Sequence, residues 1–322
     1  MQEDRSRAVR LDSFGGTDVL EVRDVPAPQA GPGQVRVRVA AAGLNPMDWI
    51  MVADDATAAR FGLSLPAGFG TDFAGVVDQV GSGVSGFAPG DRVFGGALSR
   101  AVADFVVVDA ASGAAANEVH HTPDGVDDRT AATLTIAGRT ASAALAAVSP
   151  GPGDTVLIGG AAGGVGVFAV QLARIAGARV LGTGSATSAD HLRDLGAEPV
   201  IYGDGLADRV RALAPGGVTA AIDLHGVETV HAARALGVPD RRLCTIATQV
   251  DGVTAANGAN AAPGALEEIA RLVAAGRLRV PIAASFPVEE IRRAAELQAG
   301  RHVRGKVVIN LQRPAAAPLR RS

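Results

Sequence analysis

The sequence predicts an α/β protein with two domains, a β-rich domain followed by a domain built on a parallel sheet. Two observations support this prediction. The first third of the chain carries short apolar runs separated by glycine and proline, whereas from near Asp127 alanine-rich helical segments alternate with buried strands. The 322 residues, 48% of them hydrophobic, are also enough for two separate cores.

The β-rich part begins with a clear alternation of side chains. Valine alternates with arginine over residues 35–39, and residues 104–108 form another β-rich run. Turns rich in glycine and proline at 31–33, 81–83 and 89–91 separate such runs. This pattern predicts a β-barrel or a β-sandwich.

Helices and strands alternate in the second part. Residues 131–148 predict one alanine-rich helix. Strands are then predicted at 155–158, 178–181, 200–201, 220–223 and 242–246, with helices at 165–176 and 190–195. Strands joined through helices in this way form a parallel sheet. Further on, Leu266, Ile269, Ala270 and Val273 share one helical face, and Gly276 ends that helix.

A glycine-rich turn joins the strand at 155–158 to the helix at 165–176. The turn contains Gly160, Gly163, Gly164 and Gly166, and Val165 opens the helix. Glycines let backbone amides approach a pyrophosphate, whose charge the helix N-terminus attracts. The spacing is Gly-x-x-Gly-x-x-Gly, and an ordinary strand–helix turn is the alternative. Its place in the chain favours a dinucleotide site.

The end of the second strand bears on the choice between NAD and NADP. A carboxylate there would bind the adenosine ribose, but the chain reads Gly-Thr183-Gly-Ser185. Ser185, Thr187 and Ser188 are able to donate hydrogen bonds to a 2′-phosphate, or alternatively to cap the next helix. The segment therefore favours NADPH.

Composition limits the classes of partner. A net charge of −3 and a pI near 6.1 give no basic footprint for nucleic acid. The charged N-terminus and the absence of a long apolar run favour a cytoplasmic protein that does not contact a membrane. Cys244 is the single cysteine, which excludes a multi-cysteine zinc site within one chain.

Several motifs, in this order along the chain, resemble the zinc-independent medium-chain dehydrogenase/reductase superfamily, in particular its quinone oxidoreductase (zeta-crystallin-like) branch. They lie at 43–48, 65–77, 80–84, 90–95, 136–141, 160–166 and 304–308. The resemblance implies a homodimer and three regions. These are a GroES-like β-barrel catalytic domain at 1–125, a Rossmann NADP(H)-binding domain at 126–257, and a segment at 258–322 that returns to the catalytic domain and ends in a loose tail from about 313.

The resemblance also implies roles for individual residues. Zinc-dependent relatives carry cysteine where Asn45 stands and histidine where Thr71 stands, so no catalytic metal is expected. Asn45 and Asp48 become the candidate catalytic residues, with a turn or helix cap as the alternative. The expected neighbours of the cofactor are Thr140, Tyr202, His225, Ile246, Ala247 and Thr248. The expected apolar wall of the substrate pocket is Ile50, Phe61, Phe73 and Phe94.

The predicted function is hydride transfer from NADPH to a quinone or an α,β-unsaturated carbonyl, without a metal. Two alternatives stay open. One is reduction of an enoyl thioester, as in polyketide assembly. The other is a structural or regulatory protein that binds NADPH without turnover. The residues do not identify a proton donor.

Overall fold

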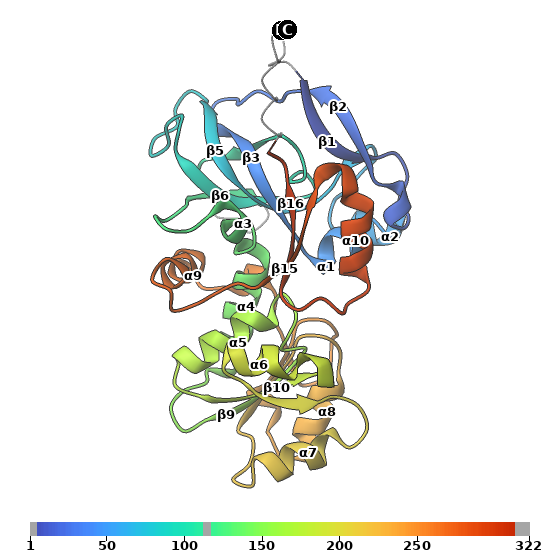
Figure 1. Cartoon of the computed structure of the whole chain (residues 1–322), viewed down its shortest axis with the longest axis vertical. Coiled ribbons are helices and arrows are strands. Elements are labelled where there is room, and N and C mark those ends of the chain that lie inside the picture. The colour runs from blue at the N-terminus through green and yellow to red at the C-terminus, as the bar shows by residue number, and fades with distance from the viewer. Residues whose placement is uncertain (1–4, 112–116, 313–322) are drawn as a thin grey trace, which may run out of the picture.

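The computed structural model describes residues 5–111 and 117–312, and the tail predicted from about residue 313 lies outside them. Figure 1 shows a β-rich region and an α/β region, with helix α4 between them. None of the described helices is both long enough and apolar enough to cross a membrane.

The β-rich region contains two sheets. The larger has the order β15-β16-β3-β5-β6-β8, with β7 also paired to β3, and the smaller has the order β2-β1-β4. The strands of the first 121 residues are β1 (Arg5–Leu11), β2 (Glu21–Pro26), β3 (Gln34–Leu44), β4 (Ala67–Gly68), β5 (Asp72–Val80), β6 (Arg92–Ala97), β7 (Phe105–Asp109) and β8 (Asn117–His121). The predicted runs at 35–39 and 104–108 fall in β3 and β7. Short helices α1 (Pro46–Ile50) and α2 (Asp55–Arg60) follow β3.

The C-terminal part of the chain completes the larger sheet. Strand β16 (Lys306–Asn310) lies between β15 (Ile282–Pro287) and β3, and it pairs antiparallel with β3 from Val307 opposite Leu44 to Asn310 opposite Ala41. Helix α10 (Ile291–Ala299) connects β15 to β16 and packs against α1. Segments from opposite ends of the chain therefore share one sheet (Figure 1).

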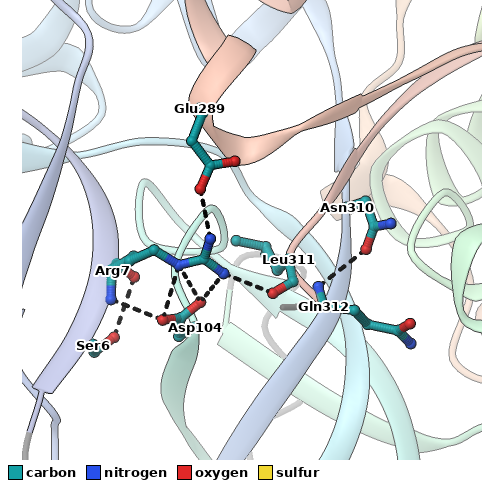
Figure 2. Close-up of polar contacts among 7 residues, drawn as sticks. All are labelled: Ser6, Arg7, Asp104, Glu289, Asn310, Leu311 and Gln312. Carbon is teal, nitrogen blue, oxygen red and sulfur yellow. Dashed lines mark hydrogen bonds and ion pairs between the residues drawn. The ribbon is translucent and has the colours of Figure 1, made fainter. Parts of the chain in front are cut away.

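An arginine on the first strand fastens this arrangement (Figure 2). The Arg7 guanidinium donates to Asp104 at 2.8 Å, to Glu289 at 2.7 Å and to the carbonyl oxygen of Leu311 at 2.9 Å. Arg7 and Asp104 are largely buried, so their charge-assisted bonds are only weakly screened by solvent. One side chain thus ties β1 to the residue that follows β16.

The α/β region is a six-stranded parallel sheet with the order β11-β10-β9-β12-β13-β14. Its strands are β9 (Thr155–Gly159), β10 (Arg179–Gly184), β11 (Glu198–Ile201), β12 (Ala220–Asp223), β13 (Leu243–Thr245) and β14 (Thr254–Ala255). The chain runs outward in one direction from β9 and then returns to place β12 on its other side. Such a reversal opens a crevice at the carboxyl ends of the two central strands, where open α/β sheets bind ligands.

Helices cover both faces of the parallel sheet. One core contains residues of α4, α5 and α9, and the opposite core contains residues of α7 and α8. The helices of this region are α3 (Asp128–Ala131), α4 (Thr135–Val148), α5 (Gly166–Ile175), α6 (Ala189–Leu195), α7 (Leu206–Leu213), α8 (Glu228–Ala235) and α9 (Ala265–Ala274).

Two helical details differ from the sequence-based expectation. The single helix predicted at 131–148 is interrupted between α3 and α4. Strand β3 comes so close to this break that a Cβ on Gly43 would lie 2.1 Å from the carbonyl oxygen of Ala132. On α9, Leu272 is buried whereas Val273 is only partly buried, so the buried face is shifted by one residue at its end.

Candidate active site

The glycine-rich turn follows β9 at the point where the strand order reverses. Gly160 has a φ of +68°, a conformation that glycine adopts without strain. Its N–H donates to the hydroxyl of Thr183 at 3.2 Å, and the N–H of Ala161 donates to the Thr183 carbonyl. Thr183, expected to contact the cofactor, is buried and supports the turn from the neighbouring strand.

The glycines of the turn differ in the space around them. A Cβ on Gly166 would lie 2.4 Å from the Ala161 carbonyl oxygen, so only glycine fits at the start of α5. At Gly163 the nearest atom would be 3.4 Å away, which is ordinary contact. The protein itself therefore leaves Gly163 open, as a turn that receives a pyrophosphate requires.

The end of β12 forms the other wall of the crevice. The buried Asp223 carboxylate accepts hydrogen bonds from the backbone N–H groups of His225 and Gly226, at 2.9 and 2.7 Å, and shapes the turn between them. A Cβ on Gly160 would lie 3.2 Å from the Cβ of His225. His225 is exposed and lies next to the glycine turn.

Three hydroxyl groups gather at the end of β10. The Ser185 hydroxyl lies 3.0 Å from the hydroxyls of both Thr187 and Ser188. Tyr202 lies near them, because its backbone N–H bonds to the Gly184 carbonyl, and its side chain is exposed. The structure thus brings together four residues expected to meet the adenosine end of a cofactor.

A buried polar network connects β3, α1, β5 and β16. Lys306 Nζ donates to Asn45 Oδ1 at 2.5 Å, and Asn45 Nδ2 donates to Asp72 Oδ2 at 3.0 Å. The Asp48 carboxylate accepts from the Asn45 backbone N–H and from the Thr71 hydroxyl, both at 2.8 Å. All five residues are at most 3% exposed. The sequence identified Asn45 and Asp48, but it gave no role to Asp72 or Lys306.

Burial sets the electrostatics of this network. Desolvation raises the pKa of Asp48 to about 7 and that of Asp72 to about 6, although hydrogen bonds and Lys306 oppose the rise. Desolvation lowers the pKa of the Lys306 ammonium, while both carboxylates act in the opposite direction. Two carboxylates and one ammonium therefore share a site in which a proton is easily held near neutral pH.

The network extends to both the glycine turn and α4. A Cβ on Gly164 would lie 3.2 Å from the Lys306 side chain, and the N–H of Gly305 donates to the Ala162 carbonyl. On the other side, the Ile136 N–H donates to Asp72 while the Ile136 carbonyl accepts from the Thr140 hydroxyl at 2.7 Å. Thr140 and the crevice are thereby linked to the same carboxylate.

The remaining predicted residues are dispersed. Ile246, Ala247 and Thr248 follow β13 at the carboxyl edge of the sheet, and Ile246 is partly buried. The four residues of the predicted apolar wall do not form one surface. Ile50 is half-buried and Phe61 is exposed, whereas Phe73 and Phe94 are fully enclosed in two different cores.

We expect the raised pKa of Asp48 to make stability depend on pH. The folded protein keeps this proton up to about pH 7 and the unfolded chain releases it near pH 4, so the contribution is fully present below pH 4 and is lost as pH rises. The difference corresponds to about 4 kcal/mol. Asp48→Asn should remove this part of the slope between pH 4 and pH 7 in denaturant unfolding. Parallel curves for the two proteins would contradict the expectation.

Among the residues that the structure describes, no three His, Cys, Asp or Glu side chains are grouped as metal ligands. The positions expected to replace two zinc ligands, Asn45 and Thr71, both bond to acidic partners inside the network. The Asn45 amide donates to the Asp72 carboxylate, and the Thr71 hydroxyl donates to the Asp48 carboxylate.

Comparison with known proteins agrees with this architecture. The chain is 38% identical to the quinone oxidoreductase of Rattus norvegicus over 182 residues, which are 55% of this chain and 52% of that protein. It is 36% identical to the quinone oxidoreductase of Pseudomonas aeruginosa over 220 residues, 66% of this chain and 63% of that protein. The matches therefore span about half to less than two thirds of these relatives.

Three solved structures cover nearly the whole chain. An NAD-dependent alcohol dehydrogenase is 29% identical with a TM-score of 0.83, over 95% of this chain and 100% of that chain. A mycobacterial protein complexed with NADPH is 27% identical with a TM-score of 0.82, over the same shares. The CurK enoyl reductase is 26% identical with a TM-score of 0.82, over 95% and 99%.

Two known domain families match parts of the chain, and the second match runs from the parallel sheet into β15 and β16 of the larger sheet. Residues 31–123 match the alcohol dehydrogenase GroES-like domain, and residues 195–309 match the zinc-binding dehydrogenase domain. With the parallel sheet, these matches confirm the predicted fold class, a GroES-like domain joined to a Rossmann-type domain of the kind that binds nicotinamide cofactors. The chain belongs to the medium-chain dehydrogenase/reductase superfamily.

Proposed function

We propose that this protein is an oxidoreductase that reduces a quinone or an α,β-unsaturated carbonyl with NADPH, without a catalytic metal. The observation that carries the proposal is the buried network of Asn45, Asp48, Thr71, Asp72 and Lys306 beside the glycine turn. The amide of Asn45 and the hydroxyl of Thr71 stand there where zinc-dependent relatives place metal ligands, and both bond to carboxylates. The names of the similar proteins support the substrate class.

The glycine turn and the crevice fit a dinucleotide. The open position at Gly163 and the N-terminus of the ten-residue helix α5 would receive the pyrophosphate. When bound, NADPH supplies the hydride. His225 lies next to the glycine turn, and Thr140 is joined through Ile136 to the Asp72 carboxylate, so the two would orient the nicotinamide end toward the network.

Asn45 is the residue proposed to act on the substrate oxygen. Lys306 and Asp72 fix the orientation of its amide, because one bonds to Oδ1 and the other to Nδ2. The second N–H of Nδ2 stays available to donate to a carbonyl oxygen that gains negative charge. The nearby ammonium of Lys306 favours the same charge, and Asp48 or Asp72 would hold the proton that completes reduction.

The three hydroxyls at the end of β10, from Ser185, Thr187 and Ser188, should favour NADPH over NADH. Each neutral hydroxyl bonded to a charged phosphate contributes about 1.5–3 kcal/mol, so two give a preference on the order of a hundredfold. Ser185→Asp should repel the phosphate and weaken NADPH far more than NADH. Dissociation constants of both cofactors for both proteins at one ionic strength test this. An unchanged ratio would show that Ser185 does not select the cofactor.

The function itself is tested by following NADPH and NADH absorbance with quinones, enones and enoyl thioesters. We expect NADPH oxidation with quinones or enones. Tight NADPH binding without oxidation by any of the three classes would contradict the proposal and favour a binding protein without turnover.

Reduction of enoyl thioesters is the second candidate. The structural likeness to the CurK enoyl reductase favours it. Activity on enoyl thioesters without activity on quinones would identify this alternative. The residues between Trp49 and Leu65 include no tyrosine, a residue often found in this loop in enone- and enoyl thioester-reducing relatives.

A further inference from the structure

A further buried carboxylate, that of Glu118, lies outside the network of Asn45, Asp48, Thr71, Asp72 and Lys306. Glu118 on β8 is completely buried, and its Oε2 accepts from Arg139 Nη1 and pairs with His120 Nε2, both at 2.9 Å. Its other oxygen, Oε1, has no hydrogen-bond partner among the described residues. An unpaired carboxylate oxygen in a protein interior is costly, and ordered water ordinarily satisfies such an atom.

The sheet register places Glu118 two strands away from the active-site carboxylate, Asp72, on the same face of the sheet. Asp72 on β5 pairs with Gly96 on β6, and Gly96 pairs with Glu118. Residues directly opposite in antiparallel strands project to the same face, and Gly96 puts no side chain between the two acids. Desolvation is the main cause of the raised pKa of Asp72, and the negative charge of Glu118 acts in the same direction. The hydroxyl of Thr135, next to the Ile136 N–H that binds Asp72, is also buried and has no hydrogen-bond partner in the described part of the chain.

His120 connects Glu118 to the surface. Its Nε2 faces Glu118, and its Nδ1 lies 3.2 Å from the carboxylate of Glu267 on α9, whose side chain is 58% exposed. The ring borders a pocket of about 360 Å³, which Phe87, Phe94 and Val119 also line. The charged groups facing this chain of side chains are Arg139 from α4, Glu267 from α9 and Asp72 from β5.

We propose that His120 and Glu118 carry protons between solvent and the buried carboxyl groups of Asp72 and Asp48. A histidine with a different carboxylate at each ring nitrogen can accept a proton on one side and release one on the other. Glu118 then passes the proton from Oε1 toward Asp72. Asp48 and Asp72 are themselves at most 1% exposed, so a route through other side chains would join them to solvent.

The inference rests on the proposed function for its use in turnover. Each reduction takes one hydride from NADPH and one proton from the buried network, so the substrate gains two electrons and two hydrogens while NADPH becomes NADP⁺. The network is left one proton short. A proton from solvent, passing through His120 and Glu118, restores the network before the next turnover.

The transfer of protons can be measured without cofactor or substrate. A pH jump from about 8.5 to about 5.5 crosses the pKa values of Asp48 and Asp72, and infrared difference spectra follow their protonation. His120→Gln keeps a hydrogen-bond donor for Glu118 but cannot carry a proton. We expect it to slow the carboxyl signal at least about tenfold, which is less than the roughly hundredfold or more that positioned proton-transfer groups typically contribute. The infrared band of the Asp72 carboxyl group is identified by its absence in Asp72→Asn.

The adjacent histidine provides the matched control. His121 bonds to the carbonyl oxygen of Gly86 and stacks on Phe87, so His121→Gln should leave the rate unchanged. Equal rates in the unmodified protein and His120→Gln, or an equal loss in both glutamine variants, would overturn the proposal. If His120→Gln does not fold, Glu267→Gln on the exposed end should slow the signal severalfold, and an unchanged rate there would equally reject the proposal.

Turnover gives an independent readout. His120→Ala should lower kcat for NADPH oxidation about tenfold without changing the KM for NADPH, and added imidazole should restore it through the pocket. A loss of kcat that imidazole does not restore would indicate a structural role and contradict the proposal. If none of the acceptors supports NADPH oxidation by the unmodified protein, the proposed function fails. The pH-jump experiment still decides the proton path in that case.

Discussion

Replacing Gly163 by valine should weaken NADPH and NADH at least about a hundredfold, or about 2.8 kcal/mol, without unfolding the protein. A Cβ at this position meets nothing closer than 3.4 Å within the protein, so we expect the fold to tolerate the larger residue. It would fill the space through which a pyrophosphate approaches the turn. Calorimetric titration measures the binding, and thermal unfolding of the cofactor-free protein measures the stability.

Two other glycines serve as controls for this result. Gly216 lies in an exposed loop with open space around its Cα, so Gly216→Val should change neither binding nor stability. Gly166→Val should instead destabilise the protein itself, because its Cβ would clash with the backbone at Ala161. Unchanged cofactor affinity in Gly163→Val would show that the glycine turn is not the binding site.

Replacing Lys306 by methionine should lower the free energy of unfolding by about 3–5 kcal/mol at pH 7. The ammonium is buried 3.9 Å from Asp72 and bonds to Asn45, so its removal leaves carboxylates without a cation in the interior. Asp48 and Asp72 become protonated, and therefore neutral, as pH falls. The loss in the free energy of unfolding should therefore be smaller at about pH 5 than at pH 7. Denaturant unfolding at the two pH values measures both effects.

A second substitution distinguishes charge from packing. Asp72→Asn in the same chain removes a carboxylate partner and should recover roughly half of the lost stability. Arg304→Met removes one exposed cation two residues away and should have little effect. A loss that is equal at both pH values and is not recovered by Asp72→Asn would mean that the lysine contributes only its packing.

Local pattern predicted most of the fold. Alternating valines in β3 and the short apolar runs that became β9 and β12 carry their secondary structure in their own sequence. The break between α3 and α4 had no such signal. It depends on the close approach of Gly43 from a strand about 90 residues earlier, which no local pattern records.

The site was predicted only where its residues are close in sequence. The glycine turn is one contiguous segment, and the three hydroxyl side chains at the end of β10 lie within the four residues from Ser185 to Ser188. Lys306 is separated from Asn45 by 261 residues, and a lysine that opens an apolar strand usually points to solvent. Only the pairing of β16 with β3 brings the two together. Phe73 and Phe94 enter two different cores, and apolar character alone does not say which core a side chain enters.

The position of β16 has a consequence for biosynthesis. More than 250 residues leave the ribosome between β3 and its neighbour β16. During that interval the edge of β3 at residues 41–44 has no β16 to pair with. An unpaired edge is a template for association with other chains, so the nascent chain is exposed to such pairing during this interval. The same strand delivers Lys306, so the reactive centre assembles only after almost all of the polypeptide has been made.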